Sequence, residues 1–212
     1  MPDFEFESQH NVPVVGIDEA GRGPWAGPVV AGAVIVLDKN LGDFLLSGLN
    51  DSKKLTAKKR ESLYEALFAA EQEGKLSIGI GQASATEIDE KNILQATFLA
   101  MNRAVAALVT RPQFALVDGN QVPKGLACPC QTVVKGDARC YSIAAASIVA
   151  KVYRDRLMTN LAKQYPYYGF EKNAGYGTAA HIAGLKTHGI IEGQHRKSYR
   201  PIQEILSASK TV

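Results

Sequence analysis

The chain has 212 residues, of which 46% are hydrophobic, and its formal net charge is +3. This length and apolar content favour one compact domain, with room for a small appendage. No stretch approaches a membrane span, and the acidic start at residues 1–7 lacks the layout of a secretory signal, so we expect a cytoplasmic protein. The small positive charge permits a polyanionic partner without requiring one.

The three cysteines do not form a recognisable zinc motif. Cys128 and Cys130 flank a proline, and neither a second pair nor a nearby histidine completes a ligand set. With Cys140 the number is odd, which argues against a disulfide framework. We expect reduced cysteines that bind no metal.

Two strands are predicted close to the N-terminus. Residues 1–11 show no clear periodicity and are interpreted as an N-terminal tail. Runs rich in valine and isoleucine then predict strands at 14–18 and 29–37. The glycine-rich segment 21–27 between them lets the backbone bend sharply or approach a ligand closely.

Helices and strands alternate through the middle of the chain. Helical spacing of apolar residues predicts a helix that ends at Gly74, and an alternating strand follows at 76–83. Residues 84–87 fit a capping box that opens a helix towards Val109. Two further short strands are predicted at 114–117 and 132–134.

The last third is helical. Residues 142–161 are alanine-rich and apolar on more than one face, which predicts a largely buried helix with a polar end. A tyrosine- and glycine-rich segment follows, and then a short helix at 179–188. We therefore expect an α/β core with a mixed central sheet at 12–162, and a C-terminal helical extension at 163–212 that packs on the core and contributes to substrate binding.

Three predicted strands lead into aspartates, namely Asp18, Asp118 and Asp137. If these strands are parallel neighbours, their acids meet at one edge of the sheet, where ligands of α/β sheets bind. Hard oxygen ligands without histidine or cysteine select Mg²⁺ or Mn²⁺. Two such ions can activate a water and stabilise the leaving oxygen in displacement at phosphorus, so the pattern indicates phosphoryl chemistry.

Glu19 directly follows Asp18, and adjacent side chains of a regular strand point to opposite faces. Both acids can serve one site only if the strand breaks at Glu19, which the following glycines would permit. Taken alone, the two acids fit an exposed, solvated turn equally well.

Several other polar residues carry two interpretations. Lys53 and Lys54 are either solvated surface or phosphate contacts, and the segment His195-Arg196-Lys197 is either a basic tail or a phosphate clamp. Asp155 lies between two arginines, where it either forms an ion pair or supports the metal site. The late histidines at 181, 188 and 195 are expected at the surface rather than in catalysis.

Several motifs occur together in one order between about residues 14 and 200. On them the sequence resembles type 2 ribonuclease H, the bacterial ribonuclease HII group. The motifs are Gly16–Pro24, Asp51–Leu55, Val117–Gly119, Gly136–Ala138, Ser142–Val152, Arg154–Arg156, Gly175–Thr178 and His195–Ser198.

The resemblance implies a ribonuclease H-like fold and hydrolysis of RNA in RNA–DNA hybrids. It also implies cleavage on the 5′ side of single ribonucleotides embedded in duplex DNA, with 3′-hydroxyl and 5′-phosphate products. By position, Asp18, Glu19, Asp118 and Asp137 match the metal-binding catalytic acids. The residues that match substrate contacts are Gly21, Arg22, Gly23, Lys53 and Tyr176, with Asp155, Arg196 and Lys197 as supporting residues.

Three alternative functions fit the sequence less well. A type 3 ribonuclease H would carry an extra N-terminal domain, against which the short tail and the Gly21-Arg22-Gly23 motif argue. A non-catalytic hybrid-binding module would not need the intact acids. A metal-free reaction would leave a cyclic phosphate. We expect a monomer without a sliding-clamp partner, since residues 203–208 lack the aromatic pair of a clamp-binding peptide.

Overall fold

A five-stranded sheet forms the centre of the computed structural model, which describes residues 2–49 and 55–208. The strands lie in the order β3-β2-β1-β4-β5. Their bounds are β1 Val14–Ala20, β2 Val29–Val36, β3 Leu76–Ala83, β4 Phe114–Asp118 and β5 Cys130–Val133.

The sheet is mixed, as expected. β2 is antiparallel to both β1 and β3, whereas β4 is parallel to β1 and β5 is parallel to β4. The carboxyl ends of β1, β4 and β5 therefore share one edge of the sheet, which is the arrangement required to bring the predicted acids together.

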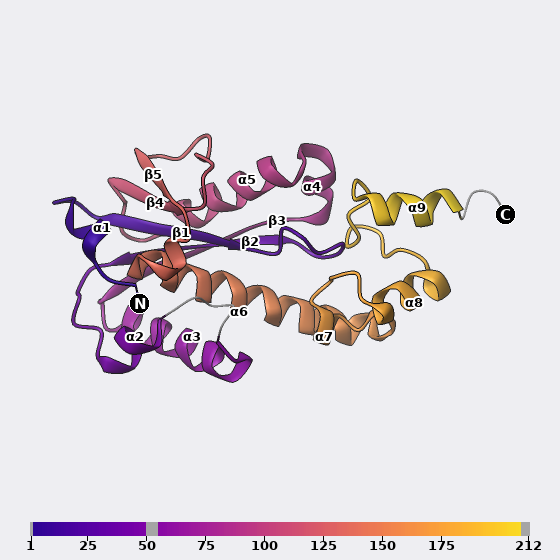
Figure 1. Cartoon of the computed structure of the whole chain (residues 1–212), viewed down its shortest axis with the longest axis horizontal. Helices are drawn as coiled ribbons and strands as arrows, with labels where there is room; N and C mark the ends of the chain where they lie inside the picture. The colour runs from indigo at the N-terminus through magenta and orange to yellow at the C-terminus, as the bar shows by residue number, and fades with distance from the viewer. Residues whose placement is uncertain (1, 50–54, 209–212) are drawn as a thin grey trace.

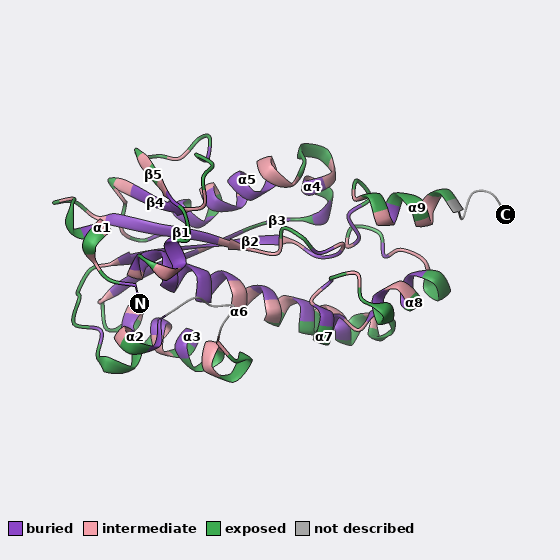
Figure 2. Ribbon diagram, in the orientation of Figure 1, coloured by how far each residue is buried: buried purple, intermediate pink, exposed green. Residues whose placement is uncertain are grey.

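Helices cover both faces of the sheet (Figure 1). One apolar core lies between the sheet and α5 (Ile93–Ala106), and another lies between the sheet and α6 (Tyr141–Gln164). The helices α2 (Asp43–Gly48) and α3 (Ala57–Gln72) add to the α6 side. Figure 2 shows that strands and the sheet-facing halves of these helices are buried.

Close approach of α6 to β1 depends on Gly16. A Cβ atom at this position would lie 2.2 Å from the main-chain carbon of Ser142, so no larger residue fits there without a shift of the helix.

The predicted helix from 85 to 109 is instead two helices, α4 (Ala85–Lys91) and α5. The capping box at Ser84 and Glu87 is confirmed. Asn92 then has φ 71°, which stops α4, and its side chain accepts hydrogen bonds from the main-chain N–H groups of Leu94 and Gln95. Asn92 thus ends one helix and caps the next.

The N-terminal segment contains the short helix α1 (Glu5–Ser8). The Glu7 carboxylate is buried and accepts hydrogen bonds from the main-chain N–H and the hydroxyl of Ser142, at 2.9 and 2.7 Å. This segment, which we expected as a tail, is therefore anchored to the start of α6.

The C-terminal part carries α7 (Phe170–Asn173), α8 (Ala179–His188) and α9 (Arg200–Ala208) beyond the end of α6. The bounds of α8 agree with the predicted helix. Short 3-10 helices are η1 (Gly136–Ala138) and η2 (Pro166–Tyr168). A separate apolar cluster joins this extension to Ala26 and Met158 of the core. Figure 1 shows the turn between β1 and β2 reaching towards this extension.

Within the described residues, we find no helix with the length and apolar content needed to span a membrane. Cys128, Cys130 and Cys140 are free thiols.

Candidate active site

Asp18 and Glu19 lie at the end of β1. The predicted break at Glu19 is wrong, because β1 continues to Ala20 and stays paired with β2 throughout. Pairing with β4, however, ends at Ile17. The last residues of β1 therefore have a neighbouring strand on one side only, and both acids line the same cavity of about 370 Å³.

Asp18 is in an unfavourable electrostatic environment for an ionised carboxyl. Its side chain is 6% exposed. Burial raises its pKa well above the usual value, and the charges of Glu19 and Asp118 raise it further. Hydrogen bonds from the Ser147 hydroxyl and the main-chain N–H of Glu19 oppose this shift. The carboxylates at the edge of the sheet therefore require a positive partner.

Asp118 and Asp137 come from the neighbouring strands. Asp118 ends β4, and its Oδ1 accepts a hydrogen bond from the main-chain N–H of Gly136 at 2.7 Å. Asp137 follows in η1, beyond the end of β5, and is 8% exposed. The sequence placed Asp137 at the end of a strand, whereas the structure places it in the 3-10 turn that follows.

The chemistry of these four acids fits a divalent cation. All their donor atoms are carboxylate oxygens, which suit a hard ion. In the ranges 2–49 and 55–208, no three histidine, cysteine, aspartate or glutamate side chains form a ready-made metal cluster. Mutual repulsion between carboxylates opposes such convergence, and the charge of a cation would remove it.

The glycine-rich turn forms one wall of the cavity together with Tyr176. Gly21 has φ +95°, and a Cβ atom there would lie 1.9 Å from Nε of Arg154. Gly23 faces the ring of Tyr176, whose side chain is 51% exposed. Arg22 Nη1 lies 3.3 Å from Glu19 Oε1. The structure thus brings Gly21, Arg22, Gly23 and Tyr176 together beside the acids.

A polar face of α6 forms another wall, and sequence analysis missed it. Ser147, Lys151 and Arg154 line the cavity. Their spacing of four and then three residues places them on one face of the helix, a signal that was present in the alanine-rich sequence. Lys151 Nζ lies 2.7 Å from Asp155 Oδ1, so Asp155 pairs with this lysine rather than with its flanking arginines.

Arg154 and Arg196 are buried guanidinium groups that hold the turn from inside. Arg196 is 0% exposed and donates hydrogen bonds to the carbonyl oxygens of Gly21, Arg22 and Gly27. Arg154 is 2% exposed and donates to the carbonyls of Pro28, Ala174 and Ala26. Both interpretations of Arg196, as a basic tail or as a phosphate clamp, are therefore wrong.

Among the predicted basic contacts, Lys197 does not line the cavity at Asp18. The main-chain N–H of Lys197 donates to Asp89 of α4, and its side chain pairs with Glu192. Its side chain therefore pairs with an acid that is not part of the cavity lining. Lys53 lies outside the described residues.

Two of the three late histidines are also not where we expected them. His181 and His195 are 0% and 1% exposed, so the predicted surface position is wrong for both, whereas His188 is exposed. The polar and basic neighbours of His195 gave no sign of its burial, and the residues that enclose both rings come from separate segments of the extension and from Trp25.

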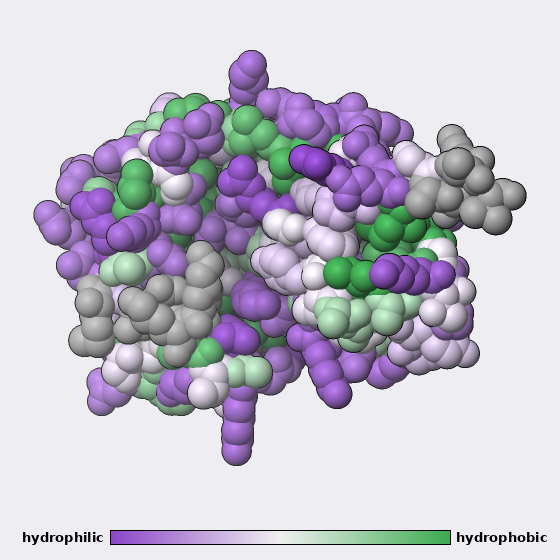
Figure 3. Space-filling view, turned by 45° about the vertical axis from the view of Figure 1, so that its right-hand side comes forward, coloured by the Kyte–Doolittle hydropathy of each residue, from purple (hydrophilic) through white to green (hydrophobic). Residues whose placement is uncertain are grey.

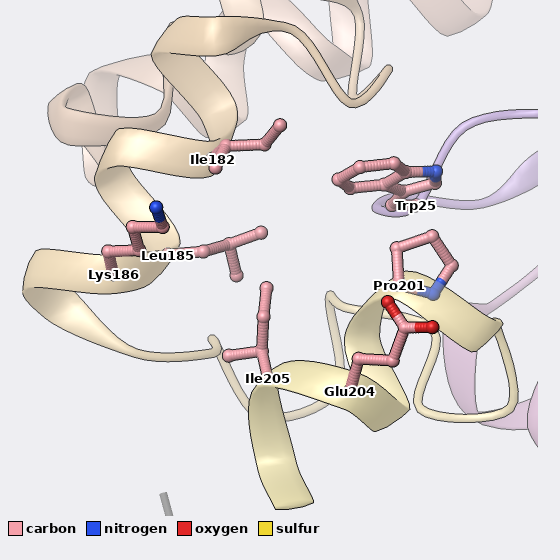
Figure 4. Close-up of a pocket in the computed structure, with 7 residues that line it drawn as sticks. All are labelled: Trp25, Ile182, Leu185, Lys186, Pro201, Glu204 and Ile205. Atoms are coloured by element: carbon pink, nitrogen blue, oxygen red, sulfur yellow. The ribbon is translucent and has the colours of Figure 1, made fainter. Parts of the chain in front are cut away.

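A second cavity, of about 500 Å³, lies behind the glycine-rich turn. Figure 4 shows Trp25 and Pro201 on one side of it, and Ile182, Leu185 and Ile205 of α8 and α9 around the rest. Figure 3 shows hydrophobic surface at this end of the molecule. The cavity has a largely apolar lining without the predicted acids, so we assign the chemistry to the cavity at Asp18.

Comparison with protein families decides the identity of the fold and site. The family model described as Ribonuclease HII matches residues 15–201, most of the chain. The chain belongs to the ribonuclease HII family. As a member, it is a metal-dependent endonuclease that acts on RNA–DNA hybrids, which confirms the reaction implied by the resemblance.

Individual relatives agree with this assignment. The chain is 52% identical over 210 residues to ribonuclease HII of Ruegeria pomeroyi, an alignment that covers 97% of this chain and 86% of the relative. It is 53% identical over 208 residues to ribonuclease HII of Gluconobacter oxydans, with 98% of each chain covered.

Solved structures confirm the ribonuclease H-like fold. Ribonuclease H2 from Pyrococcus horikoshii OT3 superposes with a TM-score of 0.77 at 28% identity and covers 94% of this chain and 99% of its own. Bst-RNase HIII, crystallised in complex with Mn²⁺, has a TM-score of 0.76 at 17% identity, with 97% of this chain and 73% of its own covered. The latter likeness supports the fold alone.

Proposed function

We propose that this ribonuclease HII cuts on the 5′ side of single ribonucleotides embedded in duplex DNA, in addition to hydrolysing RNA in hybrids, and leaves 3′-hydroxyl and 5′-phosphate ends. The observation that carries this proposal is the shared cavity. It is lined by two acids, the Gly21–Gly23 turn and Tyr176. Groups suited to phosphate chemistry and groups suited to ribose recognition thus stand side by side.

Asp18, Glu19, Asp118 and Asp137 are the residues that would hold Mg²⁺ or Mn²⁺. When bound, the metal supplies an activated water and stabilises the charge on the leaving oxygen. The protein contributes the burial of Asp18 and the fixed hydrogen bond from Gly136 to Asp118. These features constrain Asp18 and Asp118 individually, whereas convergence of all four carboxylates would need the charge of the ion.

Ribose recognition is assigned to the turn and Tyr176. A nuclease that ignores base sequence must detect the 2′-hydroxyl and the shape of the sugar. The bare backbone of Gly21 and Gly23 allows main-chain groups to approach the sugar closely, and the half-exposed ring of Tyr176 offers a flat surface. Arg22 extends from the same turn and its side chain is 48% exposed.

The division of the chain into a tail at 1–11, a core at 12–162 and an extension at 163–212 remains part of this proposal. Tyr176 belongs to the extension and lines the cavity, which supports a role of the extension in substrate binding. Asp155 would act indirectly, by orienting Lys151. Lys53 and Lys197 remain predictions as phosphate contacts at the edge of the substrate.

Predictions on partners and location rest on the sequence. A ribonuclease HII from Archaeoglobus fulgidus, 26% identical to this chain, has been solved in complex with PCNA. Residues 203–208 of this chain lack the aromatic pair of a clamp-binding peptide, so we do not extend that partner to it. We propose a cytoplasmic monomer, which gel filtration with light scattering would test.

The deciding experiment uses a DNA duplex with one ribonucleotide. We expect cleavage 5′ of that ribonucleotide with Mg²⁺ or Mn²⁺ and none with chelator. The same duplex with deoxyribose throughout is the control and should stay intact. Cleavage that persists in chelator, or products with a cyclic phosphate, would refute the metal mechanism.

A further inference from the structure

His181 and His195 form a buried pair in the C-terminal extension. Their Nε2 atoms lie 3.0 Å apart, which is a hydrogen-bond distance. Trp25, Tyr168 and Phe170 pack around the two rings. Neither imidazole lines the cavity at Asp18, and the assignment of the acids and of Tyr176 gives them no role.

The outer contacts of the pair fix where its protons lie. The main-chain N–H of Ile191 donates to Nδ1 of His195 at 2.7 Å, so this nitrogen is an acceptor and the proton of a neutral ring lies on Nε2. That Nε2–H donates to Nε2 of His181. His181 must then carry its proton on Nδ1, which donates to the carbonyl oxygen of Tyr176 at 3.0 Å.

This chain of hydrogen bonds works only with two neutral rings. A second proton on His181 would place its Nε2–H against the Nε2–H of His195 at the 3.0 Å contact, and a second proton on His195 would place its Nδ1–H against the main-chain N–H of Ile191. Burial lowers the pKa of both histidines, for His195 to about 4, so both are neutral near pH 7.

The series of hydrogen bonds ends at the main-chain carbonyl of Tyr176, whose side chain forms part of the cavity wall. Tyr176 has its carbonyl held by His181 and by the main-chain N–H of Thr178, the latter at 2.8 Å. Its ring lies against Gly23. The direction of the ring is therefore set by a main-chain segment that the imidazole pair fixes.

The other end of this hydrogen-bond relay is tied to the glycine-rich turn, which forms the same wall as Tyr176. Arg196 directly follows His195, its main-chain N–H donates to the carbonyl of Trp25 at 2.8 Å, and its guanidinium holds the carbonyls of Gly21 and Arg22. One short segment thus connects the imidazole pair to the glycine-rich turn.

We propose that His181 and His195 are positioning residues, which act as a directional hydrogen-bond relay that sets Tyr176 against Gly23 for ribose recognition. The proposal rests on the proposed role of Tyr176 at the ribonucleotide. It predicts a defined proton position on each ring, and it predicts that loss of the relay acts through Tyr176.

The first test observes the protons directly in the wild-type protein. Long-range ¹H–¹⁵N correlation spectra at pH 7 distinguish the two imidazole tautomers. We expect the Nδ1–H tautomer for His181 and the Nε2–H tautomer for His195. The same tautomer on both rings, or a charged ring, would overturn the relay. This measurement needs no variant and no substrate.

The second test uses a double-mutant cycle with embedded-ribonucleotide cleavage as the readout. His181→Leu should lower kcat/KM roughly 10- to 100-fold, since small misplacements of a substrate-positioning group have effects of that order. In a Tyr176→Ala background the same substitution should change kcat/KM by about twofold or less. A full, multiplicative loss in that background would mean that His181 does not act through Tyr176.

Two further variants separate positioning from simple stability. His181→Asn keeps an N–H donor near the position of Nδ1 and should restore most of the activity. His188→Leu is the matched control on the same helix, because His188 is exposed and stacks on Tyr167, and it should leave activity unchanged. Equal losses in the Leu and Asn variants at 181 would refute the relay.

The two proposals fail in different ways. If wild-type protein does not cut the ribonucleotide-containing duplex, the proposed function is wrong. If wild-type protein cuts but the cycle is additive or the tautomers differ, the function stands and the relay is wrong.

Discussion

Tyr176 packs against Gly23 in one wall of the cavity: a Cβ atom at Gly23 would lie 3.3 Å from Cε1 of the tyrosine. Tyr176 comes from the C-terminal extension, and Gly23 comes from the turn that directly follows the acids of β1. A sugar that contacts Gly23 therefore stands only a few residues of backbone from Glu19. Recognition of ribose and placement of the phosphate are coupled by this short connection.

Tyr176→Ala tests the recognition wall. Loss of an aromatic contact with nucleic acid costs about 1–3 kcal/mol, so cleavage at an embedded ribonucleotide should fall roughly 5- to 150-fold. The side chain is 51% exposed, and the melting temperature should change little. Kinetics on the single-ribonucleotide duplex and thermal melting check both parts. A loss of activity matched by a large loss of stability would contradict the assignment.

Gly21→Ala tests the turn. A residue other than glycine at φ +95° is strained by about 1–3 kcal/mol, and its Cβ would in addition clash with Arg154. We expect a loss of stability above that range and a loss of cleavage. Gly74→Ala is the control, because Gly74 has φ +73° but nothing within 4 Å of the added Cβ. Equal destabilisation in both variants, measured by denaturant unfolding, would exclude the clash.

Asp18→Asn should abolish turnover and stabilise the metal-free protein at pH 7. The pKa of Asp18 is raised in the folded state, chiefly by burial. Protonation therefore favours the folded state below the ordinary pKa of an aspartate, and this contribution is lost as pH rises through the raised pKa. Asparagine has no ionisable group, so the variant does not lose this stability as pH rises. Thermal melting in chelator, from below the ordinary pKa of an aspartate up to pH 7, measures the difference in stability between wild type and Asp18→Asn.

Added metal should stabilise wild type more than Asp18→Asn in the same melting experiment. A cation that binds only the folded state stabilises it by mass action, and the wild-type site retains all four acids. Mg²⁺ or Mn²⁺ should therefore raise the melting temperature of wild type more than that of Asp18→Asn. Equal shifts in both proteins would remove Asp18 from the metal site.

Arg196→Met tests the buried guanidinium. Its loss leaves several carbonyls of the turn without a donor, each at a cost of about 1–3 kcal/mol, so we expect destabilisation of about 3 kcal/mol or more. Arg200→Met is the control. Arg200 is 88% exposed and pairs with Glu204, and its replacement should change stability by about 0.5 kcal/mol or less. Denaturant unfolding of both variants measures the two losses of stability.

Local sequence patterns were enough to predict most of the sheet and the acids at its edge. Val/Ile-rich runs and strand-then-acid patterns are local signals, and they predicted β1, β2, β3 and β4 closely, with Asp18 and Asp118 at one edge of the sheet. The capping box at Ser84 and the limits of α8 were local signals as well. Motif order carried the family assignment, which the relatives confirm.

The burial of polar residues and the direction of their side chains depend on the folded arrangement of the chain. His195 and Arg196 have polar or basic sequence neighbours that predict a surface, yet both are enclosed by segments distant in the chain, as is His181. Glu19 joined Asp18 without a break in β1, because one neighbouring strand ends earlier than the other. Burial and hydrogen-bond partners depend on contacts between segments that are distant in the sequence. Local sequence patterns do not predict these contacts.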